Sequence, residues 1–402
     1  MTQSAVTRYE QTFAASLGAE RAFAFWKGRV AMYAILRALG VSPGDEVILP
    51  GYTCVMDVNP IMYLGAKPVY VDIEPVTYNM DPTLIEPAIT ERTKVIVAQH
   101  TYGYPAEMDA IAEVAERHGV TVIEDCCLSV GSRYKGRPVG SFGVAAYWSS
   151  QWNKPYTTGL GGMATTSDAA LAVKIEAVCR DEGLIQPGFR QVAMLGCQLA
   201  VYRGFIYPKT TALAQTLFRW LTRAGVVVGS SSTAEFTPDR PAGFFKAMSG
   251  LQARSGLGQL GRLAGTIEHR RRMGRLYDRL LDDMDWPRVR IPEHLDPVLV
   301  RYPVRVRDKI MALQTAARHW VELGSWFECP LHPVETPLER YGYRPGTCPV
   351  AERASAEVVN LPLHPRAGSA TAGRTVEFIA GIGPAPEIED SAGRAGGYPG
   401  GV

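Results

Sequence analysis

The sequence predicts an α/β protein whose core is a parallel sheet joined by crossover helices. Short apolar segments with strand character alternate with helical segments, which is typical of parallel strands linked by crossovers. The chain of 402 residues is long enough for two closely associated domains. The predicted strands cover residues 47–49, 67–73, 94–99 and 120–123.

The helices between these strands are expected from their caps and their apolar spacing. Residues 1–40 look helical, and Gly40 can end that helix. The run Asn79-Met80-Asp81-Pro82 is expected to start a further helix through an Asx-type cap. Residues 107–118 form the next helix, which Gly119 closes. A long helical pattern covers residues 251–279.

Composition excludes several classes of function. The net charge of +2 and the scattered basic residues predict no nucleic-acid partner. The seven cysteines are an odd number and show no metal-binding spacing. A reducing, cytoplasmic location is the simpler interpretation. The first residues lack a basic start followed by an apolar run, so we expect no signal peptide. No apolar stretch is long enough to span a bilayer, so we expect no membrane contact.

One stretch carries the clearest chemical pattern. The strand at 120–123 leads into Asp125, a second apolar run ends at Ser149, and Lys154 follows, before a glycine-rich turn at 157–162. A carboxylate, a lysine and small hydroxyl residues on neighbouring strand ends suit pyridoxal phosphate. The lysine forms a Schiff base, and the carboxylate keeps the pyridine nitrogen protonated. An aspartate after a strand and a lysine in a loop are also common in structural roles, so the pattern alone leaves both interpretations open.

The sequence of this stretch resembles that of the DegT/DnrJ/EryC1/StrS family of sugar aminotransferases. That family typically has V-I-E-D-A-A-Q, then Y-K-G-K-P-V-G-S-F-G-D, then S-F-H-P-T-K-N-x-T-T-G-E-G-G. The matching positions here are Glu124–Asp125, Tyr134–Gly136, Pro138–Gly143, Ser149, Lys154, Thr157–Gly159 and Gly161–Gly162. A match of this length in order is specific. The segment Asn360–Pro365 also resembles the closing L-P-L-H-P strand of the family.

The resemblance implies a fold type I pyridoxal-phosphate transferase with a large domain built on a mostly parallel seven-stranded sheet and a small α+β C-terminal domain. We expect the large domain at 1–265, the small domain at 266–382 and a flexible tail at 383–402. An apolar segment at about 183–242 looks inserted. It is interpreted as a lid, a dimer contact or a pocket for an apolar substrate, although ordinary packing is favoured.

The resemblance also implies which residues hold the cofactor. Lys154 and Asp125 are the catalytic pair. In the family a glycine turn before a helix holds the phosphate, and Gly28 keeps that place here. Arg29 replaces the usual threonine and is expected to bind phosphate by charge, with a solvated helix-start arginine as the alternative. Val30 belongs to the same turn.

Three further implied cofactor contacts lie elsewhere in the chain. Ser149 is expected to help hold the phosphate. Cys54 stands where the family has an aromatic that stacks on the pyridine ring, and Leu128 stands where a glutamine touches the phenolic oxygen. Tyr52 or Trp152 could stack instead, or either could be a packing aromatic.

The implied activity is that of an aminotransferase in secondary-metabolite or glycan biosynthesis. An amino-acid donor, expected to be glutamate, supplies an amino group to a keto-sugar or ketocyclitol, and a homodimer shares the active site. The altered residues leave two alternatives. One is a different pyridoxal-phosphate reaction, such as decarboxylation, epimerisation or oxidation. The other is an inactive dimer scaffold, although a scaffold has no need of Asp125 and Lys154.

Overall fold

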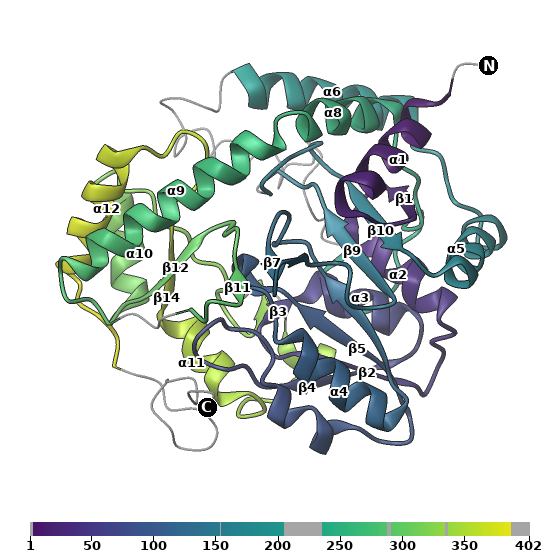
Figure 1. Ribbon diagram of the computed structural model, residues 1–402, viewed down its shortest axis with the longest axis horizontal. Coiled ribbons are helices and arrows are strands. Elements are labelled where there is room, and N and C mark those ends of the chain that lie inside the picture. The colour runs from purple at the N-terminus through teal and green to yellow at the C-terminus, as the bar shows by residue number, and fades with distance from the viewer. Residues whose placement is uncertain (1–2, 153, 205–234, 288–290, 334–336, 387–402) are drawn as a thin grey trace.

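A seven-stranded sheet forms the centre of the protein in the computed structural model, which describes residues 3–152, 154–204, 235–287, 291–333 and 337–386. Only β10 runs against the other six strands, so the predicted mostly parallel seven-stranded sheet is confirmed (Figure 1). In spatial order the strands are β1 (Arg21–Phe25), β10 (Gly162–Thr166), β9 (Ala145–Ser149), β6 (Thr121–Asp125), β5 (Thr93–Gln99), β2 (Glu46–Pro50) and β4 (Lys67–Val71).

Helices cover both faces of this sheet because successive strand residues point to opposite sides. Val47 and Val95 pack into one apolar cluster, whereas Ile48 and Ile96 pack into another on the opposite face. This two-sided burial explains why the central strands are apolar at nearly every position. The first face holds α2 (Gly28–Ala38), α3 (Val55–Tyr63) and α5 (Ala169–Asp181), and the second holds α4 (Met108–His118), α1 (Ala5–Leu17) and α8 (Gly250–Leu260).

The same alternation separates the two acids at the end of β6. Asp125 lies beside Gln99 and Tyr147 in the register of the neighbouring strands, on the face covered by α2 and α3. Glu124 therefore points to the α4 face. Asp125 can therefore take part in a site on the first face, whereas Glu124 has a structural role on the second face.

Glu124 fastens the loop between β6 and β9. Its carboxylate accepts backbone N–H bonds from Gly140 at 2.6 Å, Phe142 at 2.7 Å and Gly143 at 2.8 Å, and it contacts His100 Nε2 at 3.1 Å. Burial by itself raises the pKa of Glu124, but the bonds from His100 and the backbone outweigh it and hold that pKa below its ordinary value. The buried carboxylate is therefore ionised and satisfied.

The C-terminal part of the chain builds a second, smaller unit. Strand β12 (Tyr302–Arg305) pairs antiparallel with β14 (Val358–Leu361), which contains the start of the predicted closing strand. The division between 265 and 266 falls inside α9 and stays a prediction. The helices of this part are α9 (Leu263–Asp282), α10 (Lys309–Arg318), α11 (Pro349–Glu357) and α12 (Ser369–Ala380).

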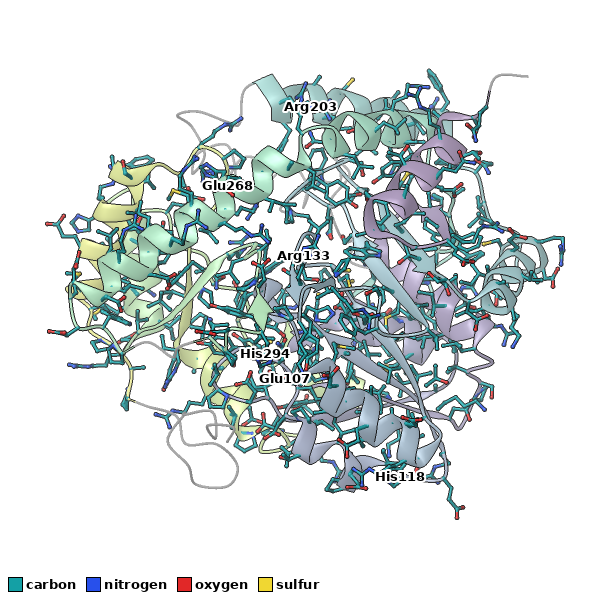
Figure 2. All side chains as sticks on the ribbon, viewed as in Figure 1. Glu107, His118, Arg133, Arg203, Glu268 and His294 are labelled. Carbon is teal, nitrogen blue, oxygen red and sulfur yellow. The ribbon has the colours of Figure 1, made fainter. Side chains whose placement is uncertain are left out.

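The two parts of the chain are joined by polar contacts as well as by packing. Figure 2 shows Glu107, at the start of α4, beside His294 from the C-terminal part, and the two form a 2.8 Å contact. Strand β11 (Leu295–Asp296) also pairs with β7 (Arg133–Tyr134). These contacts place the C-terminal part next to the carboxyl end of the central sheet.

Three predicted helices were wrong in extent. Residues 1–40 contain β1 between α1 and α2, because Gly18 adopts a left-handed conformation and ends α1, and β1 then finds a partner in β10. Asp81 caps only a 3₁₀ turn, since Pro87 lacks the N–H that a continuing helix needs. The pattern at 251–279 is two helices, α8 and α9, separated near Gly261.

Parts of two predicted segments lie outside the described residues. For the apolar segment at 183–242 these are residues 205–234, and its described part contains α6 (Phe189–Gly204). For the predicted tail they are residues 387–402. Among the helices that the structure does describe, none combines the length and the apolar character needed to cross a bilayer.

Replacing Glu124 with glutamine should destabilise the fold by about 2–4 kcal/mol, because an amide cannot accept all of these bonds and brings an N–H group against N–H donors. Urea denaturation measures this loss. The control is Glu116→Gln on the exposed side of α4, which should change stability by less than about 0.5 kcal/mol. Equal stability of the two variants would contradict the fastening role of Glu124.

Candidate active site

Lys154 is carried by a tight loop at the carboxyl end of β9. The loop closes through bonds from Ser150 N to Gly161 O at 3.0 Å and between the hydroxyls of Ser150 and Thr158 at 2.7 Å. Gly161 is required in this loop, since a Cβ there would lie 2.1 Å from Ser150 Oγ. The glycine-rich turn therefore shapes the loop that presents the half-buried Lys154.

Asp125 ends the neighbouring strand β6 and is buried. Its carboxylate accepts a bond from Cys127 N at 2.8 Å, which holds the side chain at the strand end. Tyr147 lies next to it on β9 and Gln99 on β5. Asp125 thus stands at the edge where parallel strands end, which is the position at which ligands bind in such sheets.

A second carboxylate, Asp57, lies on the first turn of α3, close to the same residues. Tyr147 Oη lies 3.3 Å from Asp57 Oδ1. Asp57 also interacts electrostatically with Asp125, Lys154 and Arg29, so the predicted catalytic pair and the predicted phosphate ligand converge on one place. Burial and then repulsion by Asp125 raise the pKa of Asp57 to about 8, against the opposing pull of the two cations.

Sequence reasoning missed Asp57, although a signal was present. It follows the strand predicted at 47–49, so it comes to the same edge of the sheet as Asp125. An acid in the first turn of such a helix is easily interpreted as a partner of the helix dipole. Only the packing of α3 on the sheet brings this acid close to Asp125 and Lys154.

The start of α2 packs tightly against the end of β9. A Cβ on Gly28 would lie 3.1 Å from Trp148 O and 3.2 Å from Ser149 Cβ, so a larger residue would push the helix away. Ser149 therefore lies beside the first turn of α2, and the phosphate-binding role of both places stays a prediction. The Val30 side chain is buried in the core.

Arg29 is buried and paired, so the alternative of a solvated arginine was wrong. Its guanidinium lies 2.9 Å from Glu235 Oε1, and Lys27 Nζ lies 2.8 Å from Glu235 Oε2. Burial and then repulsion by Arg29 lower the pKa of Lys27 to about 8, although Glu235 pulls it upward. Two cations and one carboxylate at the start of α2 leave a net positive charge when Lys27 is protonated.

Cys54 and Leu128 have different surroundings. The Cys54 thiol interacts with Asp57, Arg29 and Lys154, so it borders the same pocket. Burial and then the Asp57 charge raise the pKa of Cys54 to about 12, so it stays a neutral thiol. Leu128 packs in the main apolar cluster and supplies no polar group.

Tyr52 is a packing aromatic, which is one of the two predicted alternatives. It is fully buried, and its ring lies 4.9 Å from that of Phe327, while its hydroxyl contacts Tyr102 Oη at 2.8 Å. Trp152 is also buried and packs against Tyr202, with ring centroids 5.1 Å apart.

A loop from the C-terminal part completes the wall of the pocket. Strand β13 (Leu331–His332) pairs with β3 (Thr53–Cys54), so it holds this loop against the one that carries Cys54. Lys154 Nζ then lies 5.0 Å from the centroid of the Trp326 ring. Nothing in the sequence indicated this contact, because it joins positions that are far apart in the chain.

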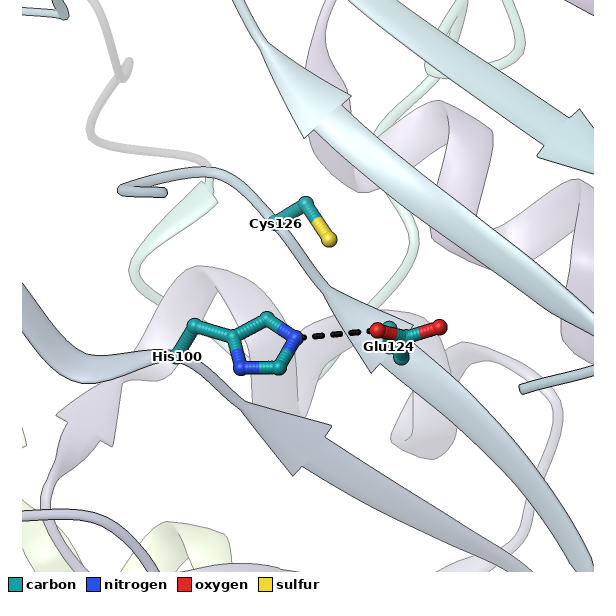
Figure 3. Close-up of side chains that lie close together, drawn as sticks. All are labelled: His100, Glu124 and Cys126. Carbon is teal, nitrogen blue, oxygen red and sulfur yellow. Dashed lines mark hydrogen bonds and ion pairs between the residues drawn. The ribbon is translucent and has the colours of Figure 1, made fainter. Parts of the chain in front are cut away.

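Figure 3 shows a cluster of His100, Glu124 and Cys126 whose donor types resemble a metal site. The geometry assigns it a structural role. His100 Nδ1 accepts the Ala106 N–H at 3.0 Å, so the remaining ring proton is on Nε2 and points to Glu124. Burial and then the nearby carboxylates raise the pKa of Cys126 well above its ordinary value, which makes it a poor ligand.

The residues that converge here fit pyridoxal phosphate. An acid for a ring nitrogen, a lysine for an aldehyde and a cationic helix start for a phosphate lie at one edge of the sheet. Leu128 has no polar side-chain atom, so it cannot make the contact to the phenolic oxygen that the resemblance implies for a glutamine at this position.

Comparison with known proteins gives a consistent result. The model of the DegT/DnrJ/EryC1/StrS aminotransferase family matches residues 1–200 and 204–380. A pleiotropic regulatory protein of Geobacillus stearothermophilus is 31% identical over 381 residues, which cover 93% of this chain and 88% of that protein.

Two further similar proteins are a named enzyme and a protein of solved structure. GDP-perosamine synthase of Caulobacter vibrioides is 44% identical over 179 residues, which cover 44% of this chain and 48% of the synthase. The match thus spans about half the length of that enzyme. The solved structure of DesV from S. venezuelae superposes with a TM-score of 0.73 at 25% identity, over 94% of this chain and 89% of DesV. These matches confirm the predicted fold type.

The stability of the cofactor-free protein should fall as pH rises, because of Asp57. Its pKa in the folded state is about 8, whereas an unfolded aspartate has a pKa of about 4, so the folded state binds a proton that the unfolded state releases between these values. Thermal unfolding between about pH 5 and about pH 8 measures this, and Asp57→Asn should flatten the decline. The exposed Asp181→Asn should leave it unchanged. A decline as steep in Asp57→Asn as in the wild type would refute this assignment.

Proposed function

This chain belongs to the DegT/DnrJ/EryC1/StrS aminotransferase family, and from that premise we propose that it moves an amino group from glutamate to the carbonyl carbon of a keto-sugar or ketocyclitol. Family membership confirms the predicted class, a pyridoxal-phosphate-dependent aminotransferase. The observation that carries the proposal is that Asp125, at the end of β6, and Lys154, in the loop after the neighbouring strand β9, both act on Asp57. The donor and the acceptor are the proposed part.

The residues of the site would act at different parts of the cofactor. When bound, pyridoxal phosphate supplies an electron sink for the carbon that loses a proton. Asp125 holds a proton on the ring nitrogen by its negative charge. Gly28, Arg29 and Ser149 would hold the phosphate at the start of α2, where the helix dipole and positive charge favour an anion.

Lys154 acts at the other end as nucleophile and base. Its Nζ would hold the cofactor aldehyde, and its free amine would serve as the base that moves a proton at the donor α-carbon. The Trp326 ring lies 5.0 Å from Lys154 Nζ, and the Cys54 thiol interacts with the same lysine. The neighbouring Asp57 makes the environment of Asp125 sensitive to pH.

The purified protein should show the visible absorption band of bound pyridoxal phosphate, and L-glutamate should bleach that band by converting the cofactor to its amine form. Lys154→Ala should remove the band, because the covalent attachment is lost. Exposed Lys174→Ala should keep it. Absorbance spectroscopy measures all three. A band that persists in Lys154→Ala would refute the role of this lysine, and a wild-type band unchanged by glutamate would refute the donor.

The organisation of the protein is also a proposal. The antiparallel pair of β12 and β14 and the helices packed on it support a small domain at 266–382 beside a large domain at 1–265. All seven cysteines are free thiols, which supports a cytoplasmic location.

A homodimer is supported by exposed apolar surface near α6. Phe189 is 86% exposed at the start of α6, and Val201 is 50% exposed near its end. A hollow of about 530 Å³ lies between α1, α6 and α8. Large exposed apolar side chains beside a hollow are typical of association surfaces. The apolar residues that line the hollow include Val6, Phe189, Val192, Met248 and Leu251.

Light scattering after gel filtration should give twice the mass of one chain for the wild type. Phe189→Glu should shift the protein towards one chain, because a carboxylate buried in an apolar interface loses its hydration. Ile310→Glu is the matched control, since Ile310 is an exposed apolar residue on α10, 70% exposed. A wild-type mass of one chain would exclude the dimer, and a dimer that survives Phe189→Glu would exclude this surface.

A further inference from the structure

Lys309 is a buried cation at the first position of α10. Its Nζ donates to the carbonyl oxygens of Phe327 at 2.6 Å, Ser355 at 2.7 Å and Ser325 at 3.2 Å. An ammonium group has three N–H donors, so each of them meets one carbonyl oxygen. The Lys309 side chain therefore joins the start of α10 to the end of α11 and to the loop that precedes β13.

This ammonium group is kept in a place that disfavours charge. Burial lowers the pKa of Lys309 to about 8, although interactions with Glu328 and then Cys329 oppose that shift. Lys309 is therefore mostly protonated near pH 7. An apolar side chain of similar length would avoid the cost of taking a charge out of water. The charge indicates that the three carbonyl oxygens need a common donor at this point of the fold.

Two of the three carbonyl oxygens belong to the residues on either side of Trp326, namely Ser325 and Phe327. The backbone of Trp326 has two further bonds, because its N–H donates to Asn360 Oδ1 at 2.8 Å and its carbonyl accepts from Tyr102 Oη. Three successive carbonyl oxygens of the segment 325–327 thus accept bonds from side chains. Lys309 supplies the first and the last of these bonds.

The Trp326 ring lies against Lys154, whose Nζ is 5.0 Å from the ring centroid. The indole N–H donates to His332 Nε2 at 3.1 Å, which sets the orientation of the ring. An ammonium group is attracted to an aromatic face at this distance. Because a lysine side chain is a flexible stem that can reach many positions, the ring restricts where Nζ lies. A shift of the backbone at 325–327 would move this ring and loosen the lysine.

We propose that Lys309 is a positioning residue for the reaction of Lys154, because its ammonium group fixes the backbone that carries the Trp326 ring. The inference rests on the proposed function, in which Lys154 holds the cofactor aldehyde. Lys309 acts through Trp326 and takes no part in the chemistry itself. Its three bonds determine how closely the ring restricts Lys154 Nζ.

Hydrogen–deuterium exchange of the cofactor-free protein tests whether Lys309 holds the loop. Lys309→Met removes the three donors and keeps an unbranched side chain, so the amides of Trp326 and Phe327 should exchange at least about tenfold faster than in the wild type. Lys309→Arg keeps a charge and several donors and should recover part of the protection. Arg318→Met is the matched control, since Arg318 is an exposed cation at the end of the same helix, and it should exchange like the wild type.

The rate at which added pyridoxal phosphate forms its visible band on the cofactor-free protein tests the effect on Lys154. This rate needs no amino donor. Lys309→Met should lower it at least about tenfold, because a displaced nucleophile reacts more slowly, and Arg318→Met should leave it unchanged. Trp326→Ala should lower it as well. The double variant of Lys309→Met and Trp326→Ala should be about as slow as Trp326→Ala alone, since Lys309 then has no ring to position.

Three outcomes overturn the proposal. They are unchanged exchange at 325–327 in Lys309→Met, an unchanged rate of band formation, and a double variant whose rate falls by the product of the two single effects, which marks a purely structural lysine. If Lys309→Met does not fold, Lys309→Gln takes its place in both measurements, because its amide keeps two N–H donors. Failure of the proposed function looks different, because then the wild-type band is unchanged by glutamate while exchange and band formation still separate the Lys309 variants from Arg318→Met.

Discussion

The site depends on how the end of β6 is held. Glu124 and Asp125 are adjacent, so the strand sends them to opposite faces of the sheet. Glu124 takes three backbone N–H groups and His100 on one face, and this binding closes the loop that returns to β9. Because the strand end is anchored from behind, Asp125 is presented in a fixed position on the other face, next to the strand that leads to Lys154.

The site brings four ionisable side chains together, of which Asp125 and Arg29 are buried and Asp57 and Lys154 are partly exposed. Asp125 and Asp57 supply two acids within reach of each other, and Lys154 and Arg29 supply two cations. Glu235 in turn neutralises part of the charge of Arg29 and Lys27. Full ionisation of both acids is unfavourable in such a place, which is why Asp57 keeps its proton to higher pH. An aminotransferase needs this control, since its chemistry consists of moving protons between a lysine and carbon.

The C-terminal part contributes to the site through one loop. The pairing of β13 with β3 brings His332 beside Cys54, and the preceding residues then place Trp326 over Lys154. Arg301 reaches the same ring from the start of β12. Lys154 therefore lies between the carboxyl end of the central sheet and the Trp326 ring of the C-terminal part.

The sequence by itself determined the parts that depend on short stretches of chain. The apolar strands, the turn at 157–162 and the ordered motif around Asp125 and Lys154 led to the α/β fold, the family and the cofactor. Local signals did not suffice where an element takes its form from a distant partner. The strand β1 exists because β10 lies beside it, and Arg29 is buried because Glu235, more than two hundred positions away, closes over it.

Only the tertiary structure decided which other side chains lie around Asp125 and Lys154. Asp57 was visible as an acid in a helix, but only the packing of α3 directs it to Asp125. Trp326 carries no motif, and its place beside Lys154 follows from strand pairing between remote segments. The physical reason is the same in each case: propensity and capping act over a few residues, whereas burial, charge pairing and ring contacts are properties of side chains that only the folded chain brings together.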